Sequence, residues 1–209
     1  EINKKAKAIL QVWLPGTEGA RAIADTLFGK YNPSGKLPMS FPYCVGQVPV
    51  HYNEYSTGRP HIEGKDKDRF RSKYLDIPNE PLYPFGYGLS YTTFEVSDIH
   101  LDRTWMDTSG QIEAEVTVKN TGNCTGTETL QLYIHDIAAS VVRPVRELKD
   151  FKKVTLRPGE EKKVVFTITE QELRFLTEDG IYASEAGEFE IFIGKDSLTG
   201  NKASFVLKK

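Results

Sequence analysis

The sequence has few cysteines and no long apolar run, and both absences narrow the possibilities. Its two cysteines, Cys44 and Cys124, lie far apart and form no C-x-x-C pair. They are too few for a disulfide framework and lack the spacing of a zinc site, so we expect two free, partly buried thiols. No apolar stretch approaches the roughly 18 residues that span a bilayer. The sequence therefore argues against a membrane partner.

An excess of charge of one sign is also missing. The formal net charge is −2 and the sequence pI is about 6.2, which leaves no basic surface for a nucleic acid. With 39% hydrophobic and 27% charged residues among 209, the composition is that of a soluble, globular protein that can bury one or two cores. The first residues contain neither an initiator Met nor the layout of a signal peptide, so we expect the chain to be cut from a longer protein.

Recognisable catalytic spacings are absent as well. No serine lies in a G-x-S-x-G motif, and no G-x-x-x-x-G-K phosphate loop occurs. The histidines have no partner at metal-ligand or triad spacing; they are His51, His61, His100 and His135. The 29 acidic residues alternate with apolar positions or lie in turns, so nothing marks a desolvated carboxylate pair. We therefore predict no catalytic, binding or metal-ligating residue in this chain and no cofactor.

What the sequence does have is a long region of alternating apolar and polar residues after Phe94. Period-two alternation predicts strands with one dry face, and turn residues separate about seven of them. The apolar faces are Ile112 to Val118, Leu130 to Ile134, Val164 to Ile168, Phe189 to Ile193, and Phe205 with Leu207. We expect an immunoglobulin-like or fibronectin type III-like β-sandwich with Val116, Leu132, Phe166 and Ile191 in one core. Tyr133 is expected to point outward, and residues 170–173 to form one helical turn.

The start of the chain has a different period. Residues 8–14 are a short apolar run, typical of a strand buried on both faces. After Pro15-Gly16, Thr17 is expected to cap a helix that carries apolar residues at helical spacing and ends at Gly29. One such strand cannot make a sheet, so we expect the rest of the sheet of this strand-loop-helix unit, residues 8–29, to lie elsewhere and the unit to need another surface to pack on. The glycines at 16–19 could alternatively form an anion site.

Residues 44–93 connect the two periodic regions and have little periodicity themselves. The charge run at 64–69 is interpreted as a solvated loop. Four side chains could contact a sugar, although packing of their rings on a neighbouring domain is favoured: Arg59, His61, Tyr74 and Tyr83. The segment ends in P-F-G-Y-G-L-S-Y-T-T-F at 84–94, where glycines and aromatic rings predict a rigid joint between two packed bodies.

Three motifs carry a family resemblance. They are W-L-P-G-T-E-G at 13–19, Y-N-P-S-G-K-L-P-M-S-F-P at 31–42, and the joint at 84–94. Together they resemble the C-terminal part of glycoside hydrolase family 3, of the periplasmic β-glucosidase type, and the match covers essentially the whole chain. The resemblance implies that 1–43 ends an α/β sandwich domain, 44–93 is a connecting arm and joint, and 94–209 is a fibronectin type III-like domain.

The same resemblance implies where the chemistry lies. In the family a (β/α)₈ barrel carries the aspartate nucleophile, and the glutamate acid/base lies upstream of the W-L-P-G-T-E-G motif, so neither maps onto this chain. Glu18 lies inside that motif, but no catalytic role is transferred to it. The implied function is the non-catalytic C-terminal part of a retaining β-glucosidase, periplasmic or secreted in a bacterium. Its implied partners are the missing N-terminal domains and an oligosaccharide held by the complete protein. Independently of the resemblance, the apolar segment at 8–37 is expected to pack on the sandwich, to pair with a second copy or to dock on the rest of the enzyme.

A second hypothesis belongs to a different class. The sandwich could be an independent module that binds carbohydrate or another protein. Such a module displays exposed aromatic rings on a flat face or at a loop end. The candidates are Trp105, Tyr133 and Phe192, which are few and lie on different predicted strands.

Overall fold

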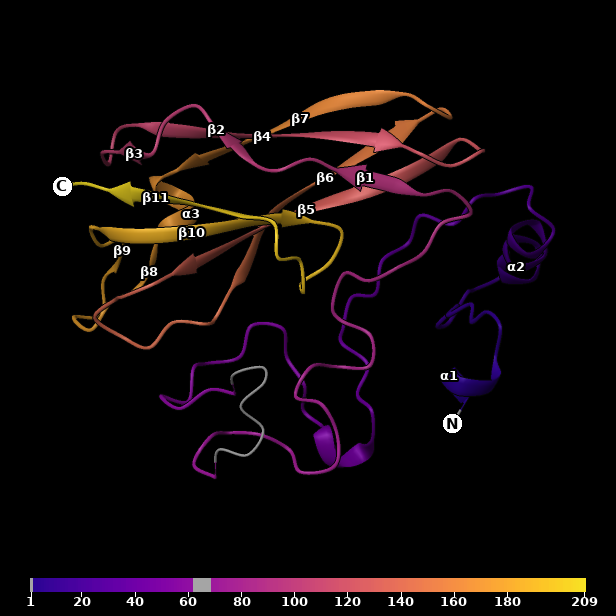
Figure 1. Cartoon of the computed structure of the whole chain (residues 1–209), viewed down its shortest axis with the longest axis horizontal. Helices are drawn as coiled ribbons and strands as arrows, with labels where there is room; N and C mark the ends of the chain where they lie inside the picture. The colour runs from indigo at the N-terminus through magenta and orange to yellow at the C-terminus, as the bar shows by residue number, and fades with distance from the viewer. Residues whose placement is uncertain (1, 62–68) are drawn as a thin grey trace.

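The computed structural model describes residues 2–61 and 69–209, and it is mainly β (Figure 1). Residues 94–209 form a two-layer sandwich, and the segments before them run along one side of it. Most of the charge run at 64–69 lies outside the described residues. Within the described residues, no helix is long and apolar enough to cross a membrane.

Two sheets form the sandwich. In the first, β4 pairs with β1, β2 and β7, and in the second the order is β3-β11-β10-β5-β6. All pairs are antiparallel except β3 with β11. The first sheet consists of β1 (Phe94–Val96), β2 (His100–Leu101), β4 (Gln111–Asn120) and β7 (Glu161–Thr169). The second consists of β3 (Trp105–Met106), β5 (Gly126–Asp136), β6 (Glu147–Leu156), β10 (Gly187–Gly194) and β11 (Lys202–Leu207).

The predicted core is confirmed. Alternate residues of the facing strands point between the sheets and exclude water, as period-two side chains must when one face of each sheet is covered. Val116, Leu132, Phe166 and Ile191 are at most 1% exposed and belong to one hydrophobic cluster. The helical turn expected at 170–173 is also present as α3 (Glu170–Leu173), which a capping box with Thr169 and Glu172 starts.

One face assignment was wrong. Tyr133 is fully buried, and its same-face neighbours Thr129 and Gln131 are 5% and 3% exposed. Phe192, on the adjacent strand β10, is only 7% exposed. The alternation correctly put Tyr133 on the face opposite to Leu132, but a segment remote in sequence covers that second face. The period-two pattern therefore could not predict that both faces of β5 are buried.

Two further elements escaped the sequence pattern. Strand β6 is rich in lysine and has few apolar positions, and a register shift opposite Leu132 and Tyr133 interrupts its pairing with β5. A hairpin of β8 (Phe175–Leu176) and β9 (Tyr182–Ala183) closes one end of the sandwich. The register shift interrupts the alternation in β6, and β8 and β9 have two residues each, which is too short for a period-two pattern to show.

The strand predicted at 8–14 does not form. The described structure has two helices in this region, α1 (Ile2–Lys5) and α2 (Gly19–Leu27), with irregular backbone between them. A strand needs a neighbour to accept its backbone hydrogen bonds, and no strand in the described parts of the chain pairs with residues 8–14. The apolar run is real, but it is left largely exposed, with Leu14 97% exposed.

The predicted helix is confirmed with a different start. Its cap residue is Glu18 rather than Thr17, and no side-chain hydrogen bond caps it. The helix ends at Leu27, and the expected terminator Gly29 follows the C-cap Phe28 with a φ of 74°, the left-handed conformation that glycine adopts at low cost. The apolar side chains at its end do not pack: Leu27 is 63% and Phe28 is 83% exposed.

Candidate functional site

The first residues of the joint, 84–88, pack on the outer face of β5. The Tyr52 ring, from the arm, stacks on Phe85 at a centroid distance of 4.3 Å and meets the edge of Tyr133 at 5.7 Å. The Tyr133 hydroxyl donates to Gln131 Oε1 at 2.5 Å. Burial raises the pKa of Tyr133, which keeps that hydroxyl a donor. These three rings join the arm, the joint and the sandwich in one contact.

Gln131 completes this contact through its amide nitrogen. Nε2 donates to the carbonyl oxygens of Gly86 at 3.1 Å and Lys195 at 2.7 Å. A Cβ atom at Gly86 would lie 2.0 Å from Gln131 Oε1, and Gly86 has a φ of 79°. Only glycine meets both requirements. The glycine-rich joint is therefore shaped for close approach to β5, and not for a phosphate.

A buried ion pair fixes the segment before the arm. Lys36 Nζ lies 2.6 Å from Glu128 Oε1 on β5, with the two side chains 13% and 7% exposed. The same ammonium donates to the carbonyl of Gly88 at 3.0 Å. Such a pair adds little net stability against an apolar substitute, but removing one partner leaves a buried charge alone. The pair thus specifies how this segment sits on the sandwich.

Asn32 ties the same segment to the joint and the sandwich. Its Oδ1 accepts hydrogen bonds from Ser90 Oγ at 2.9 Å and Tyr91 N at 2.8 Å. Its Nδ2 donates to the carbonyl of Thr125, just before β5, at 2.9 Å. One side chain therefore holds three stretches that are distant in sequence. Both cysteines are free, with Cys124 half-buried beside Asn32 and Cys44 exposed rather than partly buried.

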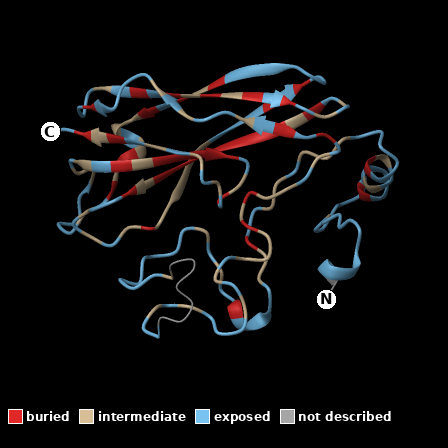
Figure 2. Cartoon of the chain, viewed as in Figure 1, coloured by how far each residue is buried: buried red, intermediate tan, exposed pale blue. Residues whose placement is uncertain are grey.

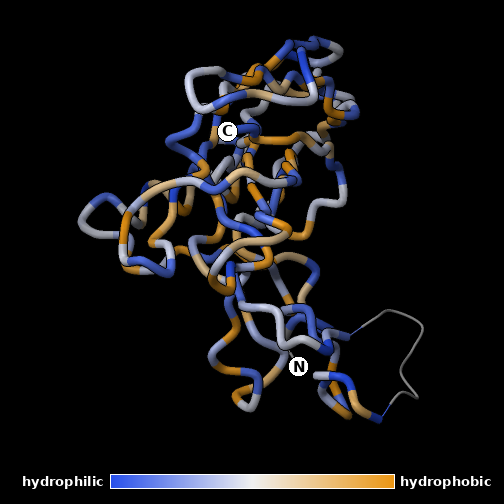
Figure 3. The backbone as a smooth tube through the Cα atoms, turned by 90° about the vertical axis from the view of Figure 1, so that its left-hand side faces the viewer, coloured by the Kyte–Doolittle hydropathy of each residue, from blue (hydrophilic) through white to orange (hydrophobic). Residues whose placement is uncertain are grey.

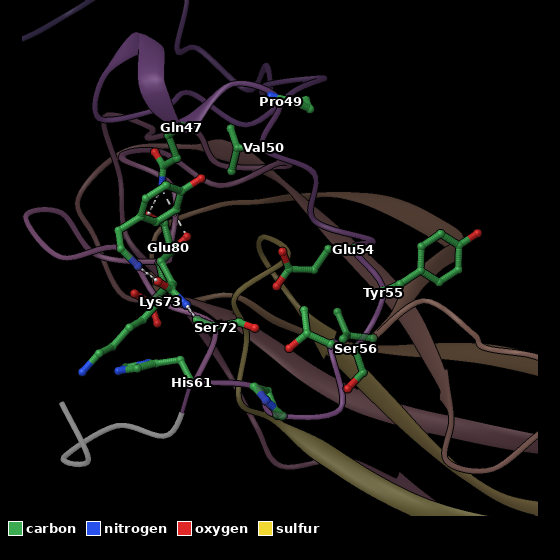
Figure 4. Close-up of a pocket in the computed structure, with 15 residues that line it drawn as sticks. Gln47, Pro49, Val50, Glu54, Tyr55, Ser56, His61, Ser72, Lys73 and Glu80 are labelled. Carbon is green, nitrogen blue, oxygen red and sulfur yellow. Dashed lines mark hydrogen bonds between the residues drawn. The ribbon is translucent and has the colours of Figure 1, made fainter. Parts of the chain in front are cut away.

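The arm also forms an open pocket of about 420 Å³ (Figure 4). Of the four side chains considered for sugar contact, His61 and Tyr74 line it. Tyr83 does not line it, because its ring stacks on Tyr87 at 5.3 Å and packs edge-on against Phe41 at 6.2 Å. Arg59 lies beside the pocket and is exposed.

Acid/base chemistry finds little support in the described residues. Burial raises the pKa of Asp136, and the nearby Arg143 guanidinium opposes that shift. Asp136 lines neither this pocket nor the smaller one against the joint. Hydrogen bonds from Ser140 lower the pKa of Glu185. Among the residues that the structure describes, no group of His, Cys, Asp or Glu could hold a metal ion.

Two alternatives lose their structural basis. At 16–19 the turn is closed by a hydrogen bond from Gly19 N to Gly16 O at 3.2 Å, and Gly16 has a φ of 68°. The glycines are thus explained by the turn itself. For an independent binding sandwich, Tyr133 and Phe192 are buried, which leaves Trp105, half exposed beside Lys208.

The residues that hold the arm were not predicted as functional, although the sequence contains a clue. The outward positions of β4 include Glu113, Glu115 and Lys119, as expected for a wet face. The corresponding positions of β5 are uncharged and include Gln131 and Tyr133. An uncharged outer face with an aromatic ring indicates a covered strand.

Comparison with known proteins supplies the wider context. A family described as "Glycosyl hydrolase family 3 C-terminal domain" matches residues 1–91, and "Fibronectin type III-like domain" matches residues 128–197. A periplasmic beta-glucosidase of Salmonella typhimurium is 51% identical over 98% of this chain and 27% of its own length. A putative beta-xylosidase of Formosa agariphila is 42% identical over 100% of this chain and 26% of its own length.

Solved structures agree with the sequence matches. The beta-glucosidase of Listeria innocua in complex with glucose aligns with a TM-score of 0.94 and 42% identity, covering 100% of this chain and 29% of the other. A beta-glucosidase of Kluyveromyces marxianus in complex with glucose aligns with a TM-score of 0.78 and 35% identity, covering 100% and 25%. The chain thus spans about a quarter of the length of the relatives it matches.

Proposed function

The chain belongs to glycoside hydrolase family 3, and from that premise we propose that it is the non-catalytic C-terminal part of a retaining β-glucosidase. The complete enzyme would remove terminal β-D-glucosyl residues from oligosaccharides or glycosides. The observation that carries this proposal is the 51% identity along 98% of the chain to a periplasmic beta-glucosidase of which it covers only 27%.

The division of labour follows from what retaining hydrolysis needs. A nucleophilic carboxylate and an acid/base carboxyl must flank the scissile bond at a separation of roughly 5–5.5 Å. In our proposal both groups belong to the part of the enzyme outside this chain, and no residue of this chain is catalytic, binds substrate in the cleft or ligates a metal. This chain then stabilises the region beside the cleft by packing.

The exposed apolar residues support a partner of this kind. Leu14, Phe28 and Val45 are 97%, 83% and 88% exposed, and each apolar side chain of this size gains about 1.5–3 kcal/mol on burial. We propose that the N-terminal domains of the same enzyme cover this surface. Residues 1–43 would complete an α/β domain, 44–93 would form the arm and joint, and 94–209 the third domain.

We also propose a location and an assembly for the complete enzyme. The relative named as periplasmic supports a periplasmic or secreted bacterial enzyme. An apolar surface left over after the enzyme is complete would support a homodimer. Light scattering on the complete protein tests this assembly directly.

The test of the activity uses the complete protein. We expect hydrolysis of an aryl β-glucoside with a clear preference over the matching aryl β-xyloside. The xyloside is included because a putative beta-xylosidase is also among the relatives. Proton NMR should show the β-anomer of glucose as the first product. Preference for the xyloside would contradict the proposed substrate, and an α-anomer released first would contradict retention.

A further inference from the structure

The arm pocket has one wall that a single buried amide fixes. Gln47 is 1% exposed. Its Nε2 lies within 3.1–3.2 Å of the carbonyl oxygens of Pro78, Asn79 and Glu80, and its Oε1 accepts from Tyr43 N at 2.8 Å. A buried side chain with this many partners holds the chain around it in one arrangement.

Two other walls are fixed by hydrogen bonds to the backbone. The Asn79 side chain accepts from Tyr74 N through Oδ1 at 3.0 Å and donates to Ser72 O through Nδ2 at 2.9 Å. On the sandwich side, Val145 N donates to Glu54 O at 2.8 Å, beside a β-bridge between Tyr55 and Pro144. The pocket is therefore largely preformed, and a ligand would spend little of its binding energy on ordering the walls.

Several polar side chains that line the arm pocket have no partner within the described structure. Within the part of the chain that the structure describes, the side chains of Glu54, Ser56 and Lys73 make no hydrogen bond or ion pair. In Figure 4 the Glu54 carboxylate points into the middle of the pocket, whereas the Tyr55 ring points away from it. The lining thus offers a carboxylate acceptor, a hydroxyl and an ammonium donor to one ligand.

The charge of the lining selects among ligand classes. Glu54 and Glu80 are opposed by Lys73, so the pocket has no excess of positive charge for a phosphate or another anion. Its polar surface also lacks the continuous apolar wall that an aliphatic ligand needs. A neutral molecule with several hydroxyl groups fits this mixture, because each hydroxyl both donates and accepts.

We propose that the arm pocket binds one sugar unit, outside the residues assigned to hydrolysis. Glu54 accepts hydrogen bonds from two neighbouring hydroxyls, Ser56 contacts the ring from the same wall, and Lys73 approaches it from the opposite wall. A pocket of about 420 Å³ is at the small end of the range for organic ligands, which suits a single hexose. The choice of a sugar rests on the proposed function; the position and polarity of the pocket do not.

The experiment titrates the 209-residue chain with glucose and with cellobiose while amide NMR shifts are recorded. We expect saturable shifts centred on residues 54–57 and 72–74, with a dissociation constant in the millimolar range because the site is open to water. Glu54→Gln should raise the dissociation constant about fivefold, as expected for loss of a charged hydrogen-bond acceptor. Glu178→Gln, a matched change in an exposed turn of the β8–β9 hairpin, should leave it unchanged.

Three outcomes would overturn the proposal. They are shifts that do not saturate, shifts scattered over the whole surface, and equal binding by the Glu54→Gln variant. An equimolar open-chain polyol should bind more weakly than glucose, because its hydroxyls are not held in one arrangement. Equal binding of the polyol would contradict a site for a sugar ring. Absence of sugar binding here, together with β-glucoside hydrolysis by the complete protein, would refute the pocket alone and leave the proposed function standing.

Discussion

The two parts of the chain on either side of Phe94 contain similar side chains and use them differently. Hydrophobic residues occur along both parts (Figure 3). After Phe94 they fill a core, whereas in the described residues before it no large hydrophobic side chain is fully buried, and most of the exposed ones lie there (Figure 2). The sandwich carries a complete core, and the first part leaves its apolar side chains exposed, which is why we propose that a partner covers them.

The largest loss of stability is expected for a substitution inside the sandwich. Phe166 is fully buried between the sheets, so Phe166→Ala should lower the free energy of unfolding by about 3–5 kcal/mol. Urea denaturation followed by tryptophan fluorescence measures it. A loss below about 1 kcal/mol would mean that the two sheets do not share a rigid core.

A smaller effect is expected where the two parts meet. Tyr133→Phe removes the hydroxyl that donates to Gln131 and leaves a buried acceptor unpaired, which costs about 1–3 kcal/mol. Hydrogen exchange should also become faster at residues 84–88, because Gln131 holds that segment. Tyr182→Phe, at a ring 64% exposed, is the control. Equal exchange in the two variants would contradict the proposed seat of the joint.

Substitutions on the exposed apolar surface should change self-association but not the stability of the fold. Leu14→Ser and Phe28→Ser change side chains that are 97% and 83% exposed, so the free energy of unfolding of the 209-residue chain should change by less than about 0.5 kcal/mol. The same changes should weaken self-association in sedimentation velocity. A large loss of stability would show that these residues already pack within this chain.

The smallest effect concerns pH and one buried acid of the sandwich. Because burial raises the pKa of Asp136 above its ordinary value of 3.8, the folded state holds this proton more tightly than the unfolded state. Stability from this group is complete below pH 3.8 and falls as pH rises through the raised pKa. Asp136→Asn should remove that fall, so its stability relative to the unmodified chain should grow between pH 3.8 and 7. A difference that does not vary with pH would refute the assignment.

Sequence periodicity predicted the sandwich core well and the first part poorly, for one physical reason. Leu132 and Phe166 alternate with polar neighbours because their burial is decided within the sheet pair. The run at 8–14 has the composition of a buried strand, yet a strand forms only beside another strand, and none of the described strands pairs with it. Tyr133 was misplaced for the opposite reason, since its cover comes from Tyr52 and Phe85, far away in sequence.

The same distinction applies to the sites. Short-range motifs such as G-x-S-x-G and C-x-x-C can be recognised in a sequence directly, and neither occurs in this one. The arm pocket could not be predicted, since Gln47, Asn79 and Val145 are brought together only by the fold. His61 and Tyr74 were considered for sugar contact as residue types and do line that pocket, but no pattern in the sequence joined them.

The most direct test of the central claim is an aryl β-glucoside assay on the purified 209-residue chain beside the complete protein. If this chain contributes packing and the other domains contribute the chemistry, the complete protein should turn the substrate over while the chain alone stays at the buffer rate. Turnover by the chain that survives removal of host glucosidase and disappears on mutating one of its own acidic residues would contradict the account.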